Sequence, residues 1–577
     1  MPTYPDLRAH IAALMDAARM AVAPEQAHVT AVVERPKQAL HGDFACNIAM
    51  QLAKPLKRNP RQIATELIAS IPASPYLAKA EIAGAGFINF FLKPEIKREL
   101  VPHIIASGPD FGRMAATGSR IQVEFVSANP TGPLHVGHGR GAAYGASLAN
   151  VLTAAGFDVQ REYYVNDAGR QMDILALSTW LRYLVLAGVQ VELPPNAYQG
   201  DYVVTMAEAL RAQDGARYVR DASEACAGVA AEEDPERRLD QLIGNAKQLL
   251  GADYAVIHAY ALNTQLDDCR DDLAAFGVTF DRWYSEQSLF DSGKIARAIE
   301  RLEAAGHLYG KDGASWFRST AFGDEKDRVV RRENGQYTYF ASDIAYHLDK
   351  IERGFARVID VWGADHHGYI PRVKGALAAL GADAGQLEVA LVQFAVLYRG
   401  GAKVSMSTRA GEFVTLRELR HEVGNDAARF FYVLRKSDQH LDFDLDLAKS
   451  QSNENPVYYV QYAHARVCSV LEQWGGDAAI LAEADPTPLT AEPETALLSR
   501  LAEYPAVIDN AARELSPHLI AFYLRELAAE FHSYYNGTRL LVPEEPIKRA
   551  RLALAVAVRS VLVNGLALLG VSAPEKM

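Results

Sequence analysis

Cysteine is scarce in this sequence. Four of the 577 residues are cysteines, and they lie far apart, at Cys46, Cys226, Cys269 and Cys468. Neither the paired CxxC spacing of a structural zinc site nor the dense framework of a small disulfide-bonded domain can be drawn from them. The sequence therefore predicts a cytoplasmic chain without a protein-bound metal.

Long apolar runs are missing as well. No stretch approaches the roughly 18 consecutive apolar residues that span a bilayer. The first residues, MPTYPDLRAH, lack the basic and then apolar pattern of a secretory signal. We therefore expect no membrane partner.

Basic residues are fewer than acidic ones: 59 lysines and arginines stand against 71 aspartates and glutamates, which gives a formal net charge of −12. Taken over the whole chain, this balance argues against a nucleic-acid partner, although acidity often serves solubility alone and local basic clusters exist. The length predicts about two to four domains. We find no internal repeats and no long low-complexity tract.

Residues 121–142 organise the rest of the chain. Residues 121–127 are rich in β-branched and aromatic side chains, which predicts a strand. Two prolines and a glycine within residues 129–133 exclude both a helix and ladder pairing. A helical pattern then covers residues 140–155 and stops at a glycine.

The chemistry of this stretch is that of an anion site. The first N–H groups of a helix have no partner within it, and the helix dipole favours negative charge there. His135 and His138 lie on one side of the first turn, and Gly137, Gly139 and Gly141 let a bulky group approach the backbone. The phosphates of ATP are the ligand that this pattern predicts. A glycine-rich turn with two polar histidines is the alternative.

HVGH at residues 135–138 resembles the HIGH signature of class I aminoacyl-tRNA synthetases. A bare HxGH also occurs in small nucleotidylyltransferases, so four residues are a moderate signal. The longer string from Glu124 to His135 is similar to that of arginyl-tRNA synthetases in particular. The HIGH-like motif comprises Ala128, Asn129, Pro130, Thr131, Gly132, Pro133, Leu134, His135, Val136, Gly137 and His138.

The resemblance implies an α/β fold with a class I Rossmann-like parallel sheet in a catalytic domain at residues 119–415. The alternating strand and helix patterns of this region agree. An alanine-rich helical pattern at about 190–275 is interpreted as an insertion. Residues 1–115 are expected to form an additional α+β domain, and residues 416–577 an all-α bundle.

Several elements can be placed more closely. Within the catalytic domain, further strands are expected at residues 157–165, 278–284, 358–362 and 387–398, and only helices beyond Thr415. In the N-terminal domain, strands are expected at residues 29–34 and within 82–92.

GDFACN at residues 42–47 alone predicts a turn that leads into a helix. Arginyl-tRNA synthetases carry a similar segment in an N-terminal domain associated with the outer corner of tRNA, where the D-loop lies. The resemblance therefore implies tRNA contacts at Asp43 and Asn47. A capped helix start is the alternative.

An arginine pocket must meet a planar, permanently charged guanidinium, which carboxylates bind best. The resemblance places Glu124 and Asp343 on the substrate side chain, with Tyr339 as the pocket wall. It places Ser127 and Asn129 at the backbone end of the substrate. Glu124 alone could be an outward-facing strand carboxylate, but its position immediately before the signature favours the pocket.

The resemblance implies that His135, Gly137 and His138 bind ATP. His135 and His138 would be the catalytic pair that stabilises the transition state. Asp365 and His366 resemble the ribose and adenine contacts of the family. Mg²⁺ is expected to arrive with ATP as the substrate complex.

A loop at residues 403–409 resembles the KMSKS signature but departs from it. Ser405 and Thr408 stand where the signature has lysines. An ordinary surface loop is the alternative, and which of its two cations would face pyrophosphate is left open. The candidate ATP ligands here are Lys403, Met406, Ser407 and Arg409.

Aromatic and polar residues recur at helical spacing in the C-terminal region, where the family binds the anticodon. Tyr458, Gln461, Tyr462 and Arg466 are the candidate tRNA ligands, since such a face can stack on unpaired bases. Burial in the core is the alternative for the tyrosines. Candidate phosphate contacts are Arg420, Arg429, Arg435, Lys436, Arg539, Lys548, Arg549 and Arg551.

These residues and the resemblance together predict an arginine–tRNA ligase that uses ATP, L-arginine and tRNA(Arg), and we expect it to be a monomer. Three rivals stay open: a class I synthetase for another amino acid, a non-catalytic tRNA-binding paralogue, and a dinucleotide-dependent oxidoreductase. The last is prompted by Gly137, Gly139, Gly141 and Glu162, although the glycine spacing does not match GxGxxG.

Overall fold

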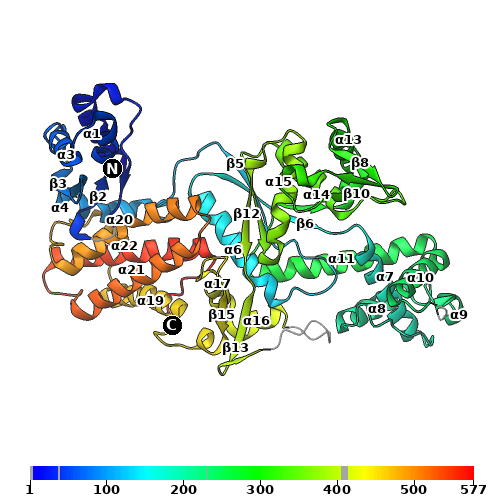
Figure 1. Ribbon diagram of the computed structural model, residues 1–577. Helices are drawn as coiled ribbons and strands as arrows, with labels where there is room; N and C mark the ends of the chain where they lie inside the picture. Colours follow the sequence, from blue (N-terminus) through cyan, green and yellow to red (C-terminus); the bar gives the residue numbers. More distant parts are fainter. Residues whose placement is uncertain (1–3, 37–38, 230–231, 405–413) are drawn as a thin grey trace.

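A computed structural model of the chain describes residues 4–36, 39–229, 232–404 and 414–577. A parallel sheet lies at the centre of the molecule (Figure 1). The N-terminal module and the C-terminal helices lie on one side of this sheet, and a group of helices from the middle of the chain lies on the other.

The central sheet has five parallel strands in the order β12-β11-β5-β6-β7. They are β5 (Arg120–Glu124), β6 (Asp158–Val165), β7 (Arg282–Ser285), β11 (Arg357–Gly363) and β12 (Leu387–Val392). The strand order reverses between β5 and β11, and ligands of such sheets bind at that point, beyond the carboxyl ends of the strands. The predicted Rossmann-like α/β fold is confirmed.

Helices connect the strands and cover both faces of the sheet. They are α6 (Val136–Ala154), α7 (Arg170–Leu186), α14 (Tyr339–Glu352) and α15 (Ile370–Ala379). Alternation along β5 sends Ile121 and Val123 into the core shared with α6, whereas Glu124 faces α14. The sheet is therefore buried on both faces.

The stretch between α7 and β7 is helical, as the sequence predicts. It contains α8 (Asp201–Asp214), α9 (Ala222–Ala225), α10 (Pro235–Leu250) and α11 (Ala252–Ala275). Most of these helices share a separate hydrophobic core with α7. Between β7 and α14 follow α12 (Gln287–Asp291), α13 (Lys294–Ala304) and an antiparallel sheet of β8 (Leu308–Lys311), β9 (Ala314–Phe317) and β10 (Arg328–Arg331).

The single strand expected over residues 387–398 is wrong. β12 ends at Val392, and β13 (Ala395–Arg399) belongs to another sheet, with β14 (Ala402–Lys403) and β15 (Leu441–Asp444). The break occurs because the N–H of Gln393 donates to the carbonyl of Ser437 at 2.9 Å, which turns the chain out of the central sheet. β15 also corrects the expectation of helices alone beyond Thr415.

The N-terminal module has an antiparallel sheet in the order β1-β2-β4-β3. Its elements are α1 (Leu7–Val22), β1 (Val33–Glu34), β2 (Phe44–Cys46), α2 (Ile48–Leu56), α3 (Pro60–Ala69), β3 (Leu77–Ala83) and β4 (Phe87–Leu92). GDFACN thus forms a strand before its helix. Residues 84–92 form a turn and then a strand, as the sequence predicts, and this turn joins β3 to β4 in a hairpin. α4 (Pro94–Arg98) and α5 (Leu100–Ser107) lead to the catalytic region.

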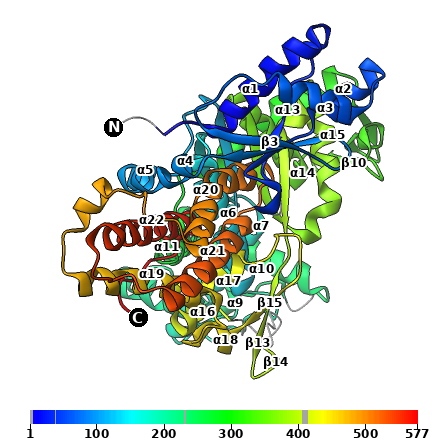
Figure 2. The same cartoon turned by 90° about the vertical axis from the view of Figure 1, so that its left-hand side faces the viewer.

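The C-terminal region is a helical bundle beside the central sheet (Figure 2). Its helices are α16 (Leu416–Val423), α17 (Asn425–Val433), α18 (Leu445–Lys449), α19 (Pro456–Trp474), α20 (Glu492–Arg513), α21 (His518–Gly537) and α22 (Glu545–Leu569). By length and mean composition α22 could cross a membrane, although Arg559 interrupts its apolar residues and no unbroken apolar run of that length exists there. It packs against α5, α6, α19, α20 and α21, and 72% of its most apolar window is buried.

Candidate active site

His135 and His138 cap the helix that they begin. The Nδ1 atom of His135 accepts the N–H of Gly137 at 3.0 Å, and the Nδ1 atom of His138 accepts the N–H of His135 at 3.2 Å. The two rings stack with their centroids 3.7 Å apart and their planes inclined by 24°. α6 therefore starts at Val136, earlier than the sequence pattern predicts, because two side chains bind N–H groups that the helix leaves unpaired.

Both imidazoles are neutral at physiological pH. Burial lowers the pKa of His135, and burial together with His135 lowers the pKa of His138 to about 3. Since both Nδ1 atoms accept backbone N–H groups, the proton of each neutral ring is assigned to Nε2. Each ring thus carries an N–H donor at the carboxyl end of β5.

The three glycines near the motif have different neighbours. A Cβ on Gly137 would meet the ring of His135, and a Cβ on Gly139 would meet Tyr432 at 2.8 Å. A Cβ on Gly141 would meet nothing within 4 Å. At Gly139, the group that approaches the backbone is thus the side chain of Tyr432 on α17. The sequence did not predict this contact.

The guanidinium of Arg140 joins α6 to the segments that follow the central sheet. It donates to the carbonyls of Gln393 and Gln439 at 2.8 Å and of Lys436 at 2.9 Å. No carboxylate is among these partners, and burial lowers the pKa of Arg140 to about 10. The sequence around Arg140 gives no sign of this role, because the role depends on carbonyl groups about 250 to 300 residues away.

Glu124 lies at the last position of β5 and is buried. Its Oε1 atom accepts the hydroxyl of Ser127 at 2.8 Å, and its Oε2 atom accepts the ammonium of Lys350, on α14. Both of its oxygens therefore have a partner within the chain. The side-chain amide of Asn129 donates to Gln171 at 2.9 Å nearby.

Asp343 lies on the second turn of α14 and accepts the hydroxyl of Tyr369. Burial raises the pKa of Asp343. Burial raises the pKa of Tyr164, and the charges of Glu286, Asp343 and Glu124 raise it further, so all three carboxylates lie within electrostatic reach of this hydroxyl. Tyr339 begins α14, and 59% of its surface is exposed.

Glu286 is a third carboxylate at this place, and sequence analysis missed it. It follows β7 directly and is 3% exposed. Its Oε2 atom and the hydroxyl of Tyr164 have no hydrogen-bond partner among the described residues. Burial, followed by the charge of Asp343, raises the pKa of Glu286 to about 7. The signal that could have found it is an acidic residue immediately after a strand of a parallel sheet.

The other candidate ATP ligands lie beyond β11 and in the loop that contains residues 403–409. Asp365 and His366 lie beyond β11 in a short helical turn (Ala364–Tyr369), where both are exposed and 3.7 Å apart. Lys403 ends β14 and is exposed. Met406, Ser407 and Arg409 lie outside the described residues.

In the N-terminal module, Asp43 and Asn47 both have structural partners. Asp43 accepts the N–H of Leu92 at 2.8 Å and forms an ion pair with Lys97 at 2.5 Å. Asn47 precedes α2, and its side-chain oxygen accepts Gln51 at 2.8 Å.

The candidate tRNA ligands of the C-terminal bundle lie on α19. The rings of Tyr458 and Tyr462 stack 5.9 Å apart, and the guanidinium of Arg466 lies 4.5 Å above the ring of Tyr462. Gln461 is 7% exposed and donates to Asp426 at 2.8 Å and to the carbonyl of Ser572 at 3.0 Å.

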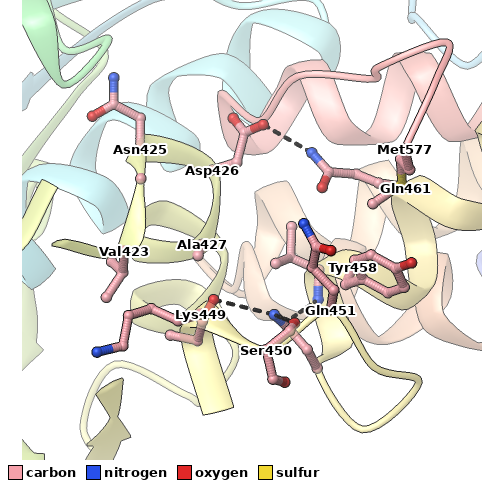
Figure 3. Close-up of a pocket in the computed structure, with 14 residues that line it drawn as sticks. Val423, Asn425, Asp426, Ala427, Lys449, Ser450, Gln451, Tyr458, Gln461 and Met577 are labelled. Atoms are coloured by element: carbon pink, nitrogen blue, oxygen red, sulfur yellow. Dashed lines mark hydrogen bonds between the residues drawn. The ribbon is translucent and has the colours of Figure 1, made fainter. Parts of the chain in front are cut away.

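Tyr458 and Gln461 line a pocket of about 440 Å³ between α17, α18 and α19 (Figure 3). The ends of α16 and of the chain, at Val423 and Met577, close its sides.

Two of the expected phosphate contacts are wrong. Arg429 is buried and donates to the carbonyls of Leu569 and Phe276 at 2.9 and 3.0 Å. Arg420 pairs with buried Asp272. Both side chains join helices, which their sequence neighbours could not reveal. Of the others, Lys436, Lys548, Arg549 and Arg551 form ion pairs with acidic neighbours.

Comparison with known proteins matches the whole chain. The profile of the arginyl-tRNA synthetase N-terminal domain matches residues 6–92. That of the class I (R) tRNA synthetase catalytic domain matches residues 100–190 and 254–442, and that of the DALR anticodon binding domain matches residues 460–577.

A curated arginine–tRNA ligase from Azoarcus sp. (strain BH72) is 67% identical over 98% of both chains. One from Nitrosospira multiformis is 65% identical over the full length of both. The chain belongs to the arginyl-tRNA synthetases. The structure of the Thermus thermophilus arginyl-tRNA synthetase has the same fold, with a TM-score of 0.75 and 24% identity over 99% of this chain and all of that one.

Because the chain belongs to the arginyl-tRNA synthetases, the HVGH stretch is not that of a dinucleotide-dependent oxidoreductase or of a synthetase for another amino acid. Among the described residues, no group of three or more histidine, cysteine or acidic side chains could hold a metal ion.

Proposed function

We propose that this chain is an arginine–tRNA ligase: it activates L-arginine with ATP to arginyl-adenylate and transfers the arginine to tRNA(Arg), with release of pyrophosphate and AMP. The observation that carries this conclusion is the full-length identity of 65–67% with curated arginine–tRNA ligases. As expected of the family, arginine activation should require tRNA.

In the activation step, the carboxylate of arginine attacks the α-phosphate of ATP. The protein contributes position and charge stabilisation. The neutral rings of His135 and His138 donate Nε2–H groups to the phosphates as negative charge moves towards pyrophosphate. Mg²⁺ enters with ATP and is held by the phosphates.

The arginine side chain lies beyond the carboxyl ends of β5, β6 and β7. Asp343 and Glu286 accept the guanidinium, because neither has a cationic partner among the described residues and a guanidinium is best met by carboxylates. Tyr339 forms the outer wall. The resemblance assigns Glu124 to the substrate side chain, but Lys350 already pairs with this carboxylate, so we assign it instead to the backbone end of the substrate. Ser127 and Asn129 lie there with it, where the ammonium group needs acceptors.

The adenosine part of ATP lies over the carboxyl end of β11, against Asp365, His366 and Gly137. Lys403, Met406, Ser407 and Arg409 belong to the loop that approaches the phosphates. Substitution of Lys403 and of Arg409, one at a time, will show which of the two cations contacts pyrophosphate.

Transfer RNA binds along the C-terminal bundle and the N-terminal module. Tyr458, Tyr462 and Arg466 present stacking faces and a cation to unpaired bases, and Gln461 lines the same pocket as Tyr458. Asp43 and Asn47 shape the N-terminal surface for the outer corner of tRNA. Asp43 is not itself a phosphate ligand, since an anion repels phosphate.

The domain boundaries that we propose are residues 1–115, 119–415 and 416–577. The enzyme acts as a cytoplasmic monomer, for which size-exclusion chromatography with light scattering is the test.

ATP–pyrophosphate exchange, measured with each amino acid in the presence of tRNA, tests this function. Only arginine should support exchange. Arg466→Ala should raise the KM for tRNA about tenfold, the loss of one stacked cation contact, with the KM for arginine unchanged. Arg513→Ala, which removes an exposed arginine paired with Asp509, is the matched control. Exchange with another amino acid instead of arginine would refute the assignment.

A further inference from the structure

Three neighbouring strands place a carboxylate at the same level of the central sheet. Asp360 on β11 is in register with Glu124 on β5, and Glu124 is in register with Glu162 on β6. All three side chains are buried. α14 lies over this row and supplies Lys350 and Arg353, one helical turn apart.

Lys350 holds two of these carboxylates across the point where the strand order reverses. Its Nζ atom donates to Asp360 at 2.6 Å and to Glu124, and the side chain is completely buried. His347 holds the other oxygen of Asp360 at 2.8 Å. Burial opposes ionisation of Asp360, but the charge of Lys350 and the hydrogen bonds of Lys350 and His347 outweigh it and hold the pKa of Asp360 below its usual range, so this pair is ionised.

Glu124 in turn holds a strained turn at the start of the HIGH-like stretch. Val126 and Ser127 have φ values of +68° and +42°, a region that β-branched and bulky residues rarely enter. The hydroxyl of Ser127 donates to Glu124 and accepts the N–H of Tyr164 at 3.0 Å. Glu124 and the N–H of Tyr164 therefore hold the side chain of Ser127 in this turn from two sides.

We propose that Lys350 is a positioning residue for arginine binding, which fixes Glu124 and, through it, Ser127 in the orientation that receives the backbone end of the substrate. Lys350 does not touch the substrate. The inference rests on the proposed roles of Glu124 and Ser127, and it adds the residue that sets their geometry.

Two variants separate positioning from stability. Lys350→Met leaves two buried carboxylates without their cation, which destabilises the fold. Lys350→Met combined with Asp360→Asn restores the net charge of the cluster but leaves Glu124 without its anchor. Lys294→Met is the matched control, because it removes the ion pair of another lysine with α14, to Asp349 at 2.7 Å, and leaves every bond of Glu124 and Asp360 in place.

We expect Lys350→Met to lower the melting temperature and the double variant to recover most of that loss. In ATP–pyrophosphate exchange with tRNA, the double variant should keep a KM for arginine raised about tenfold or more, with the KM for ATP within about threefold of wild type. Lys294→Met should change neither.

The inference is overturned if the double variant restores the KM for arginine to within about twofold of wild type, since Lys350 would then act on stability alone. Ser127→Ala tests the underlying site separately. An unchanged KM for arginine in Ser127→Ala would refute the proposed arginine site itself, whereas a raised KM there with a normal double variant would refute only the role of Lys350.

Discussion

The phenol of Tyr432 donates a hydrogen bond to the carbonyl of Val136 at 2.9 Å and lies directly over Gly139. A ring from α17 thus covers the first turn of the helix that begins with the HVGH stretch. The close approach requires the absence of a side chain at Gly139, and it connects the catalytic helix with the segment that leads to the C-terminal bundle.

Alanine at Gly139 should therefore destabilise the protein. The new Cβ would lie 2.8 Å from Tyr432, and overpacking of this kind costs about 1–3 kcal/mol. Gly141→Ala, two residues along the same helix, meets no atom within 4 Å and should stabilise by about 0.5–1 kcal/mol, because alanine favours helix. Thermal unfolding of both variants checks the prediction, which fails if they shift the melting temperature equally.

Replacement of His138 by alanine should lower the turnover of ATP–pyrophosphate exchange about 10²- to 10³-fold, as expected for a donor that stabilises developing charge. The helix also loses a cap, so the melting temperature should fall slightly. His440→Ala is the control, since that histidine is exposed and pairs only with Asp442 at 2.8 Å. Unchanged turnover in His138→Ala would exclude it from the mechanism.

Arginine binding should depend on pH through Glu286. Its pKa of about 7 in the free enzyme keeps much of this carboxyl neutral at and below that pH, whereas a guanidinium binds the ionised form. The KM for arginine should therefore rise about tenfold for each pH unit below 7. In Glu286→Gln the KM should be high and nearly independent of pH between 6 and 8. A wild-type KM that stays constant across this range would contradict the role of Glu286.

The same carboxyl has an opposite effect on stability. Between pH 4.5 and 7 the folded protein keeps a proton on Glu286 that the unfolded chain has released, so this group makes the free energy of unfolding fall as pH rises. Comparison of wild type with Glu286→Gln by urea unfolding at several pH values isolates this contribution.

Arg140→Met should destabilise the protein by roughly 3–5 kcal/mol, because it leaves several buried carbonyls without a donor. Turnover should fall as well, since α6 carries His138 and loses its connection with residues 436–439. Arg161→Met, which removes a single bond to Asn150 at 2.8 Å, is the matched comparison. Thermal unfolding with exchange kinetics measures both effects, and equal losses in the two variants would contradict this account.

The sequence by itself determined the parallel sheet, the helical insertion, the helical C-terminal region and the place of the HVGH stretch. These features follow from local causes: periodicity of apolar residues, turn-forming glycines and prolines, and a helix start. It could not separate β12 from β13, because that break depends on a bond from Gln393 to Ser437, 44 residues away.

Only the tertiary structure decided which charged groups meet. Lys350 lies between Glu124 and Asp360, and Glu286 lies within electrostatic reach of Asp343. Arg140 donates to backbone carbonyls, and Arg429 does so instead of contacting phosphate. The physical reason is that the role of a charged side chain depends on its burial and on its partners. Both arise only when distant strands and helices pack together, so a local sequence pattern does not reveal them.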